Sequence, residues 1–375
     1  MEEIKMVDLN GQYEKIKKEV DEAIQRVLDT TAFIKGPDVK AFELALASYL
    51  GAGTVISCAN GTDALQIAMM ALELQPGDEV ITTPFTFVAT VEVLKLLGLK
   101  PVFVDIDPGT YNIDTDQLKD KISGRTKAIV PVHLFGQSSN MELLSALASE
   151  HGLHIIEDAA QSLGCNYRFS DGSIRKSGTI GTIGCTSFFP SKNLGAFGDG
   201  GALFTNNPIL AAKLQALVNH GMIQRYHYDY VGVNSRLDTL QAAILNVKLK
   251  YLDDYNRARK YAAEFYDNAL GGLKGITIPS RSKFSDHIFH QYTLRVDGGK
   301  RDGLKTHLEK SSVPSMIYYP VPLHLQKAYA DLGYKNGDFP FAEQACNEVL
   351  SLPMHTELSE EQLFFITERI IEFVN

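Results

Sequence analysis

Short apolar runs alternate with amphipathic stretches between about residue 54 and residue 205. The predicted strands are TVISC, EVITTPFTF, PVFVDI, KAIVPVHL and HIIEDAA, and the predicted helices between them are GTDALQIAMMALEL, VATVEVLKLLG, TDQLKDKI and NMELLSALASEHG. Almost every strand position is apolar, which is typical of parallel strands covered by helices on both faces. The pattern predicts an α/β fold with a mostly parallel sheet, and ligands are expected at the carboxyl ends of its strands.

The pattern changes after about residue 210. Two longer helical stretches follow, NPILAAKLQALVNHG and SRLDTLQAAILNVKLKYLDDYNRARKYAAEFYDNAL, and we expect the second to be one helix that links two domains. The remaining segments mix short strands and helices, which indicates a smaller α+β unit. Because 375 residues exceed one ordinary core, we expect a large domain over residues 1–245, with an N-terminal helical segment, and a small domain over residues 246–375.

Composition narrows the functional classes. Hydrophobic residues make up 45% and charged residues 22%, as in a globular protein, and the formal net charge of -9 argues against nucleic-acid binding while leaving room for a nucleotide ligand. The four cysteines are scattered, and no histidine or cysteine spacing indicates a metal site. The N-terminal segment lacks the apolar core of a signal peptide, and no apolar run is long enough to cross a bilayer, so we expect a cytoplasmic protein.

Two strand ends carry polar groups that suit a planar, phosphorylated ligand. HIIEDAAQSLG places Asp158 and Gln161 after an apolar strand, where the carboxylate either caps the next helix or keeps a heterocyclic nitrogen protonated. CANGTDAL runs from a strand through Gly61 and Thr62 into a helix, whose free N–H groups favour an anion, although Thr62 could serve only as a helix cap. In TTPFTFVAT, Phe87 is either a core residue or a platform for a flat ring.

A lysine completes this set. Lys192 stands between the apolar run SFFPS and the glycines of NLGAFGDGG, so it is either a surface lysine or an amine held out of water. Desolvation lowers the pKa of a lysine and makes its neutral amine available for Schiff-base chemistry. An anion cradle, a ring platform, a carboxylate and a nucleophilic lysine together match the needs of pyridoxal phosphate.

The segments EDAAQ, SFFPSKNLGAFGDGGALFTNN, GVNSRLDTLQAAIL and YYPVPLH together resemble the DegT/StrS family of pyridoxal phosphate-dependent nucleotide-sugar aminotransferases, over almost the whole chain. The resemblance implies the aspartate aminotransferase-like fold (type I), in which the small domain completes the substrate pocket. It also implies a homodimer with shared active sites. Some relatives with a histidine at the position of Lys192 are dehydratases, so the lysine indicates transamination.

The resemblance also implies the role of each site residue. Lys192 would bind the cofactor covalently and move the proton, and Asp158 would pair with the pyridinium nitrogen. The other implied contacts are Gln161 to the phenolic oxygen, Phe87 to the ring face, Gly61, Thr62, Ser187 and a partner subunit's Asn234 to the phosphate, and Tyr318, Tyr319 and His324 to the sugar nucleotide.

The sugar is the least determined part of the interpretation. HGMIQRYHYDYVGVNSRLD is most similar to members that aminate C3 of UDP-2-acetamido-2-deoxy-3-oxo-glucuronate with L-glutamate, for polysaccharide or lipopolysaccharide biosynthesis. The uronate carboxylate would need a cation, and Arg225 is either that cation or a solvated loop residue. The alternatives are a dTDP-3-oxo-6-deoxyhexose 3-aminotransferase and, from a different class, a non-catalytic regulator that binds pyridoxal phosphate.

Overall fold

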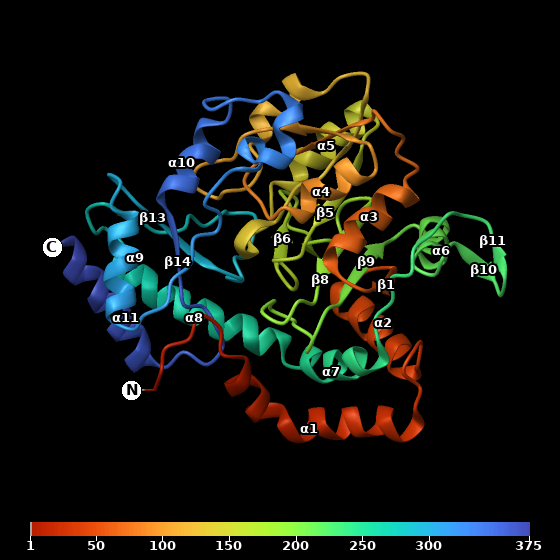
Figure 1. The fold of residues 1–375 in the computed structure, drawn as a ribbon, viewed down its shortest axis with the longest axis horizontal. Coiled ribbons are helices and arrows are strands. Elements are labelled where there is room, and N and C mark those ends of the chain that lie inside the picture. The colour runs from red at the N-terminus through yellow and green to blue at the C-terminus, as the bar shows by residue number, and fades with distance from the viewer. Residues whose placement is uncertain (1) are drawn as a thin grey trace.

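The computed structural model describes residues 2–375, which form a seven-stranded sheet between helices and a smaller three-stranded sheet beside it (Figure 1). The large sheet has the order β1 (Thr54–Cys58), β9 (Gly201–Thr205), β8 (Ile183–Ser187), β5 (His154–Asp158), β4 (Thr126–Ile129), β2 (Glu79–Thr82) and β3 (Lys100–Phe103). Only β9 runs antiparallel to its neighbours, β1 and β8. The predicted mostly parallel sheet is therefore confirmed.

Helices cover both faces of this sheet because its strands carry apolar side chains on both. On one face, Ile56 and Ile156 pack in a cluster with α3 (Gly61–Ala71), α4 (Ala89–Leu96) and α6 (Pro208–Leu217). On the other, the neighbouring residues Val55 and Ile155 pack against α2 (Pro37–Leu50), α5 (Met141–His151) and α7 (Thr239–Leu249). The alternation of side chains along each strand thus divides the core into two layers.

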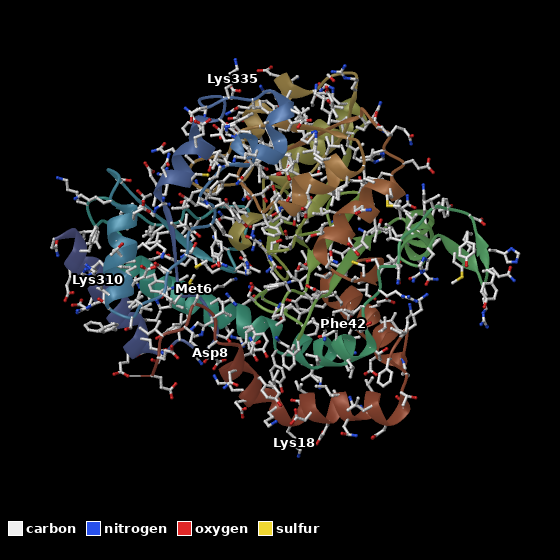
Figure 2. The ribbon with its side chains drawn as sticks, viewed as in Figure 1. Met6, Asp8, Lys18, Phe42, Lys310 and Lys335 are labelled. Carbon is white, nitrogen blue, oxygen red and sulfur yellow. The ribbon has the colours of Figure 1, made fainter. Side chains whose placement is uncertain are left out.

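The first helix lies outside the sheet and the two layers of helices that cover it. Helix α1 (Leu9–Thr30) begins at Asp8, whose side chain accepts a hydrogen bond from Gly11 N, and it runs along α7 at the bottom of Figure 1. Its buried residues recur at helical spacing and pack on α7; they are Ile16, Val20, Ala23 and Val27. Phe42 of α2 lies inside the core, whereas Lys18, Lys310 and Lys335 point outward (Figure 2).

Two predicted helices differ from the structure. TDQLKDKI is not an α-helix but two 3-10 turns, Thr115–Gln117 and Lys119–Lys121, because Leu118 is its only fully buried apolar side chain and does not support a longer helix. The expected linking helix is also wrong as a single element, since it breaks at Lys250–Tyr251 into α7 and α8 (Leu252–Leu270). Neither glycine nor proline marks the break, which lies where the helix changes from one set of packing partners to another.

The C-terminal unit has its own core. The antiparallel strands β12 (Ile276–Thr277), β13 (Tyr292–Val296) and β14 (Val349–Leu352) pack with α8, α9 (Arg301–Lys310) and α11 (Glu360–Val374). Ile4 from the N-terminus joins the same cluster. Helix α7 crosses the expected boundary between residues 245 and 246, so we propose that the domains divide at the α7–α8 break instead. Among residues 2–375, no helix combines the length and apolar character needed to cross a bilayer.

One carboxylate joins the two parts of the molecule. Asp105, two residues after β3, is buried and accepts hydrogen bonds from the N–H groups of Phe341 and Ala342, each at 2.9 Å. These donors open α10 (Pro340–Glu348), whose N-terminus receives no side-chain cap from Phe339 at its start. A residue of the large sheet therefore caps a helix of the C-terminal segment and holds it beside the strand ends.

We predict that Asp105→Ala lowers the free energy of unfolding by about 2 kcal/mol, because the buried N–H of Ala342 and the part-buried N–H of Phe341 lose their acceptor. Asp105→Asn keeps one acceptor oxygen and should lose less. Urea unfolding followed by circular dichroism measures both variants. Equal losses, or no loss in either, would show that Asp105 does not act as the cap.

Candidate active site

The predicted site residues meet at one edge of the large sheet because their strands end there. Asp158 is the last residue of β5 and Ser187 the last of β8, while Gly61 begins α3 just after β1. Strands β1, β5 and β8 run in the same direction, with β9 antiparallel between β1 and β8. Segments more than a hundred residues apart in the sequence thus form one site at the carboxyl ends of the strands.

Two adjacent carboxylates end β5, and they face different surroundings. Glu157 is fully buried and its oxygens accept hydrogen bonds from the N–H groups of Gly178, Ile180 and Gly181, and from His133 Nε2 at 2.9 Å. His133 Nδ1 accepts from the Ser139 N–H, so the imidazole proton is on Nε2. Glu157 is therefore held by four donors in the protein interior and is not available to a ligand.

Asp158 points the other way along the alternating strand. It is 6% exposed, and its Oδ2 accepts a hydrogen bond from Thr90 Oγ1 at 2.8 Å while its Oδ1 accepts from Ala160 N at 3.2 Å. Among residues 2–375, no cation lies within ion-pair distance of this carboxylate. A nearly buried carboxylate without a cation suits a ligand that brings a positive charge.

Lys192 lies in the loop after β8 and is half-buried. Its backbone N–H donates to the carbonyl of Phe189 at 2.8 Å, which forms the turn that presents the side chain. Burial lowers the pKa of the amine to about 8, although the negative charge of Asp158 acts in the opposite direction. Within the described part of the chain the amine has no ion-pair partner, so it combines a lowered pKa with a free nitrogen.

The start of α3 forms a cradle for an anion. Asn60 caps the helix by accepting a hydrogen bond from Asp63 N at 2.8 Å, which leaves the N–H groups of Gly61 and Thr62 without helical partners. A Cβ atom on Gly61 would lie 2.8 Å from the Cβ of Ser187, so only glycine permits this close approach. The Ser187 hydroxyl lies beside these donors, and the three groups suit a phosphate.

The two phenylalanines after β2 have different positions. Phe85 is fully buried in a cluster of aromatic side chains, whereas Phe87 is 55% exposed, with its ring centroid 6.5 Å from that of Tyr319. An exposed aromatic face beside a polar site can stack on a planar ring. Of the two, the structure therefore leaves only Phe87 free for that role.

Gln161 connects the large sheet to the C-terminal segment. Its Oε1 accepts a hydrogen bond from Phe135 N at 2.7 Å, and its Nε2 donates to the hydroxyl oxygen of Tyr319 at 3.3 Å. Burial raises the pKa of Tyr319 above its ordinary value, so the phenol stays protonated. Tyr318 is half-buried beside it, with its ring centroid 6.0 Å from that of Tyr319.

Three predicted residues do not join this cluster within the subunit. His324 is buried, its Nε2 lies 3.0 Å from Glu343 Oε1, and its ring packs against Phe339. Asn234 is exposed. Arg225 is exposed on the hairpin of β10 (Met222–Gln224) and β11 (His227–Tyr228), which projects from the side of the molecule in Figure 1, and its guanidinium contacts the ring of Tyr226.

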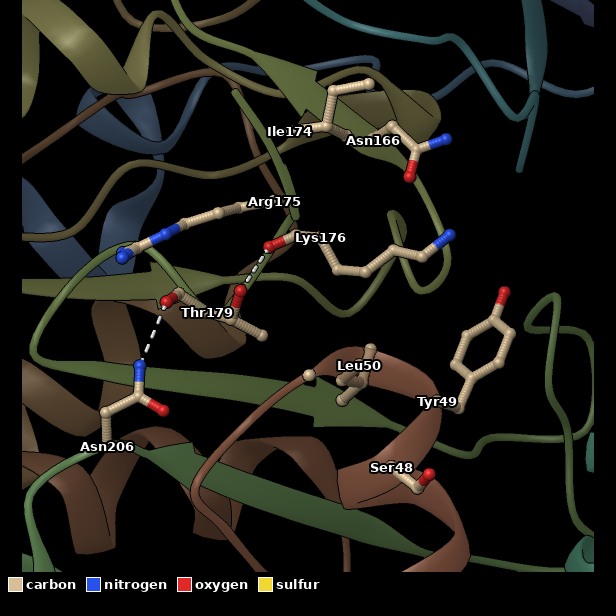
Figure 3. Close-up of a pocket in the computed structure, with 10 residues that line it drawn as sticks. Ser48, Tyr49, Leu50, Asn166, Ile174, Arg175, Lys176, Thr179 and Asn206 are labelled. Atoms are coloured by element: carbon tan, nitrogen blue, oxygen red, sulfur yellow. Dashed lines mark hydrogen bonds between the residues drawn. The ribbon is translucent and has the colours of Figure 1, made fainter. Parts of the chain in front are cut away.

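The sequence interpretation did not single out Thr90, which hydrogen-bonds to Asp158. Its signal is weak: a threonine three residues after Phe87 in the mostly apolar stretch VATVEVLKLL. The structure also has a depression of about 500 Å³ between α2 and the hairpin of β6 (Asn166–Arg168) and β7 (Ile174–Lys176), with Arg175 and Lys176 among its lining residues (Figure 3). None of the predicted site residues lines it, so it is separate from the lysine site.

The family model described as "DegT/DnrJ/EryC1/StrS aminotransferase family" matches residues 14–371. A protein of Geobacillus stearothermophilus named "Pleiotropic regulatory protein" is 46% identical over 99% of this chain and 98% of its own. The UDP-2-acetamido-2-deoxy-3-oxo-D-glucuronate aminotransferase of Pseudomonas aeruginosa is 46% identical over 97% and 98%. A dTDP-3-amino-3,4,6-trideoxy-alpha-D-glucose transaminase of Streptomyces venezuelae is 38% identical over 99% and 96%.

Solved structures agree with this similarity. DesV of S. venezuelae, in complex with a ketimine intermediate, superposes with a TM-score of 0.96 at 38% identity and covers 100% of this chain and 99% of its own. NtdA of Bacillus subtilis, with bound PMP cofactor, has a TM-score of 0.89 at 32% identity and covers 98% and 83%. The predicted fold is that of these aminotransferases.

The lowered pKa of Lys192 gives a pH-dependent prediction. With a pKa of about 8 instead of 10.5, half of the amine is neutral near pH 8, and the neutral fraction levels off about one to two pH units higher. We therefore expect borohydride trapping of pyridoxal phosphate on cofactor-free protein to be half-maximal near pH 8 and to reach its plateau between about pH 9 and pH 10, with the label on Lys192 in peptide maps. Lys192→Ala should lose this label.

Lys248 provides an internal control for that experiment. Burial lowers its pKa to about 8 as well, but Lys248 lies on α7, and its side-chain nitrogen is over the ring of Phe197 and not beside the anion cradle. If basicity alone selected the lysine, both would be labelled equally. Equal labelling, or a plateau that appears only above pH 10, would contradict the assigned site.

Proposed function

Because the chain belongs to the DegT/DnrJ/EryC1/StrS aminotransferase family, we propose that it transfers an amino group to C3 of a 3-oxo nucleotide sugar. The protein is a pyridoxal phosphate-dependent sugar aminotransferase. The proposed acceptor is UDP-2-acetamido-2-deoxy-3-oxo-glucuronate, with L-glutamate as donor, for polysaccharide or lipopolysaccharide biosynthesis. The observation that supports the reaction is the free, weakly basic amine of Lys192 beside the cation-free carboxylate of Asp158.

The residues present fit the cofactor. The close approach of Gly61 to Ser187 leaves a cradle with free N–H groups, Phe87 exposes one ring face, and Asp158 offers a nearly buried carboxylate. Pyridoxal phosphate supplies an electron-withdrawing ring when it is bound. We propose that Asp158 keeps the ring nitrogen protonated, that Gln161 orients the phenolic oxygen, and that the Thr62 and Ser187 groups hold the phosphate.

Lys192 would then do two things in turn. Its neutral amine would hold the cofactor covalently, because desolvation lowers its pKa to about 8 and keeps a fraction of it unprotonated near neutral pH. When it is not bonded to the cofactor, the same nitrogen would accept and return a proton as a general base and acid. Tyr319, whose hydroxyl binds Gln161, places a small-domain side chain beside this path.

The site is proposed to be completed by a second copy of the chain. Asn234 and Arg225 are exposed, and the projecting hairpin carries apolar side chains that a monomer would leave in water, among them Ile223 at 63% and Tyr226 at 72% exposure. A groove of about 600 Å³, mostly lined by apolar residues including Ile209 and Ile223, runs beneath it. An exposed apolar patch of this kind supports a homodimer in which each hairpin reaches the other subunit's site.

Arg225 is the proposed partner for a uronate carboxylate, since a cation at the tip of that hairpin can make a charge-assisted contact. Tyr318 and Tyr319 are proposed to line the sugar nucleotide. His324 is buried against Glu343, so we propose that it shapes the pocket without contacting the substrate directly.

The dTDP-sugar relative at 38% identity supports a dTDP-3-oxo-6-deoxyhexose as the second candidate. The relative named as a regulator is compatible with a regulatory protein, but Lys192 and Asp158 are both present here.

Substrate choice can be tested with the protein in its pyridoxamine form. We expect UDP-2-acetamido-2-deoxy-3-oxo-glucuronate to restore the visible absorbance of the lysine-bound cofactor, and Arg225→Ala to weaken this acceptor by about tenfold or more, as for the loss of a charged hydrogen bond. A dTDP-3-oxo-6-deoxyhexose should be unaffected by Arg225→Ala, because it has no carboxylate. Restoration by 4-oxo sugars alone would refute amination at C3.

A mixing experiment tests whether two subunits share each site. Lys192→Ala and Asn234→Ala homodimers should each be impaired. After unfolding and refolding together, the mixed dimer has one site with an intact Lys192 from one subunit and an intact Asn234 from the other, so activity should return to about a quarter of wild type per total subunit in a random mixture. If each site used residues of a single subunit, mixing would restore nothing.

A further inference from the structure

A buried chain of hydroxyl groups ends on Asp158. Thr90, in the first turn of α4, donates from Oγ1 to Asp158 Oδ2 at 2.8 Å, and its own Oγ1 lies 3.3 Å from the Oγ1 of Thr86. Thr86 is 3% exposed and Thr90 is 1% exposed. All three side chains are therefore shielded from water, where hydrogen bonds to a charged group contribute most.

The direction of these hydrogen bonds follows from the number of hydrogens. A threonine hydroxyl has one hydrogen, and an ionised carboxylate can only accept. Since the Thr90 hydrogen points at Asp158, the hydrogen between the two threonines must come from Thr86. The chain therefore donates from Thr86 to Thr90 to Asp158, and each bond polarises the next one toward the carboxylate.

The position of Thr90 in its helix leaves its hydroxyl free for this contact. Thr90 is the second residue of α4, so no carbonyl of its own helix lies three or four residues earlier for the hydroxyl to bond to. Thr90 instead reaches across to β5, and the other Asp158 oxygen is occupied by the Ala160 N–H at 3.2 Å. With one donor on each oxygen, the plane of the carboxylate is held at two points.

We infer that Thr90 is a positioning residue for the transamination chemistry: its hydroxyl holds Asp158 Oδ2 in the orientation in which it meets the ring nitrogen. The inference rests on the proposed function, because it needs Asp158 to be the partner of that nitrogen. Thr86 in turn donates a hydrogen bond to Thr90 and holds its hydroxyl in place.

The Thr90 hydrogen bond also bears on the proton of the ring nitrogen. A hydrogen bond to the ionised form of a carboxylate stabilises that form, so the proton shared with a ring nitrogen stays on the ring. Without the Thr90 donor, Asp158 Oδ2 would lose one of the two contacts that orient its carboxylate and would stabilise the protonated ring less. The ring would then withdraw fewer electrons, and the nitrogen that joins Lys192 to the cofactor would become more basic. The titratable groups that interact electrostatically with Asp158 are Lys192, Cys185 and Tyr319, and all remain in the variants below.

The test is a pH titration of the visible absorbance of the cofactor-loaded protein, together with its cofactor dissociation constant. Thr90→Val keeps the shape of the side chain and removes the donor. It should raise the titration midpoint by about one pH unit, a tenfold change in proton affinity, and weaken cofactor binding by about tenfold. Thr90→Ser restores the hydroxyl and should return both values to near wild type, and Thr86→Val should produce a smaller shift of the same sign.

Thr82 supplies the matched control. Its buried hydroxyl donates to the Val130 carbonyl at 2.8 Å and has no contact with Asp158, so Thr82→Val should leave the midpoint and the cofactor affinity unchanged. A folded Thr90→Val protein that titrates like wild type would overturn the inference, as would an equal shift in Thr82→Val. Failure of the proposed function looks different: wild type itself would then show no lysine-bound absorbance, or Asp158→Asn would not alter it.

Discussion

The site depends on a carboxylate and an amine of opposite charge that interact without forming an ion pair. Asp158 acts on the pKa of Lys192, yet among the described residues no salt bridge joins them, and burial lowers the amine's pKa to about 8. If the two groups met directly, each would favour the charged form of the other, and the amine would stay protonated and unable to act as a nucleophile. The fold instead places them on separate segments, Asp158 at the end of β5 and Lys192 in the loop after β8.

The sheet makes this separation possible. Side chains alternate along β5, so Glu157 enters the interior, where four donors satisfy it, and Asp158 faces the site. The same alternation gives each strand two apolar faces, which hold helices on both sides and keep the strand ends rigid. The Asp105 cap holds the start of α10 to the segment after β3, and a separate hydrogen bond from Gln161 holds Tyr319 at the site.

Local pattern was enough to predict the mostly parallel sheet, because the apolar runs of its strands and the glycines that follow some of them are visible in the sequence itself. It was not enough to separate Phe85 from Phe87, since both follow the same strand and only the packed structure shows which ring is covered. The helix break at Lys250–Tyr251 was missed for a similar reason: it is a change of packing partners, with no glycine or proline at the break. Thr90 of α4 is identified only by its hydrogen bond to Asp158 at the end of β5, which the sequence does not show.

The most direct measurement is a crystal structure of the protein loaded with pyridoxal phosphate. The account predicts electron density continuous with Lys192 Nζ, the ring nitrogen within hydrogen-bond distance of Asp158 Oδ2, Phe87 against the ring face, and the phosphate between the start of α3, Ser187 and the Asn234 side chain of a second subunit. Density on another lysine, or a phosphate held away from Gly61 and Thr62, would contradict it.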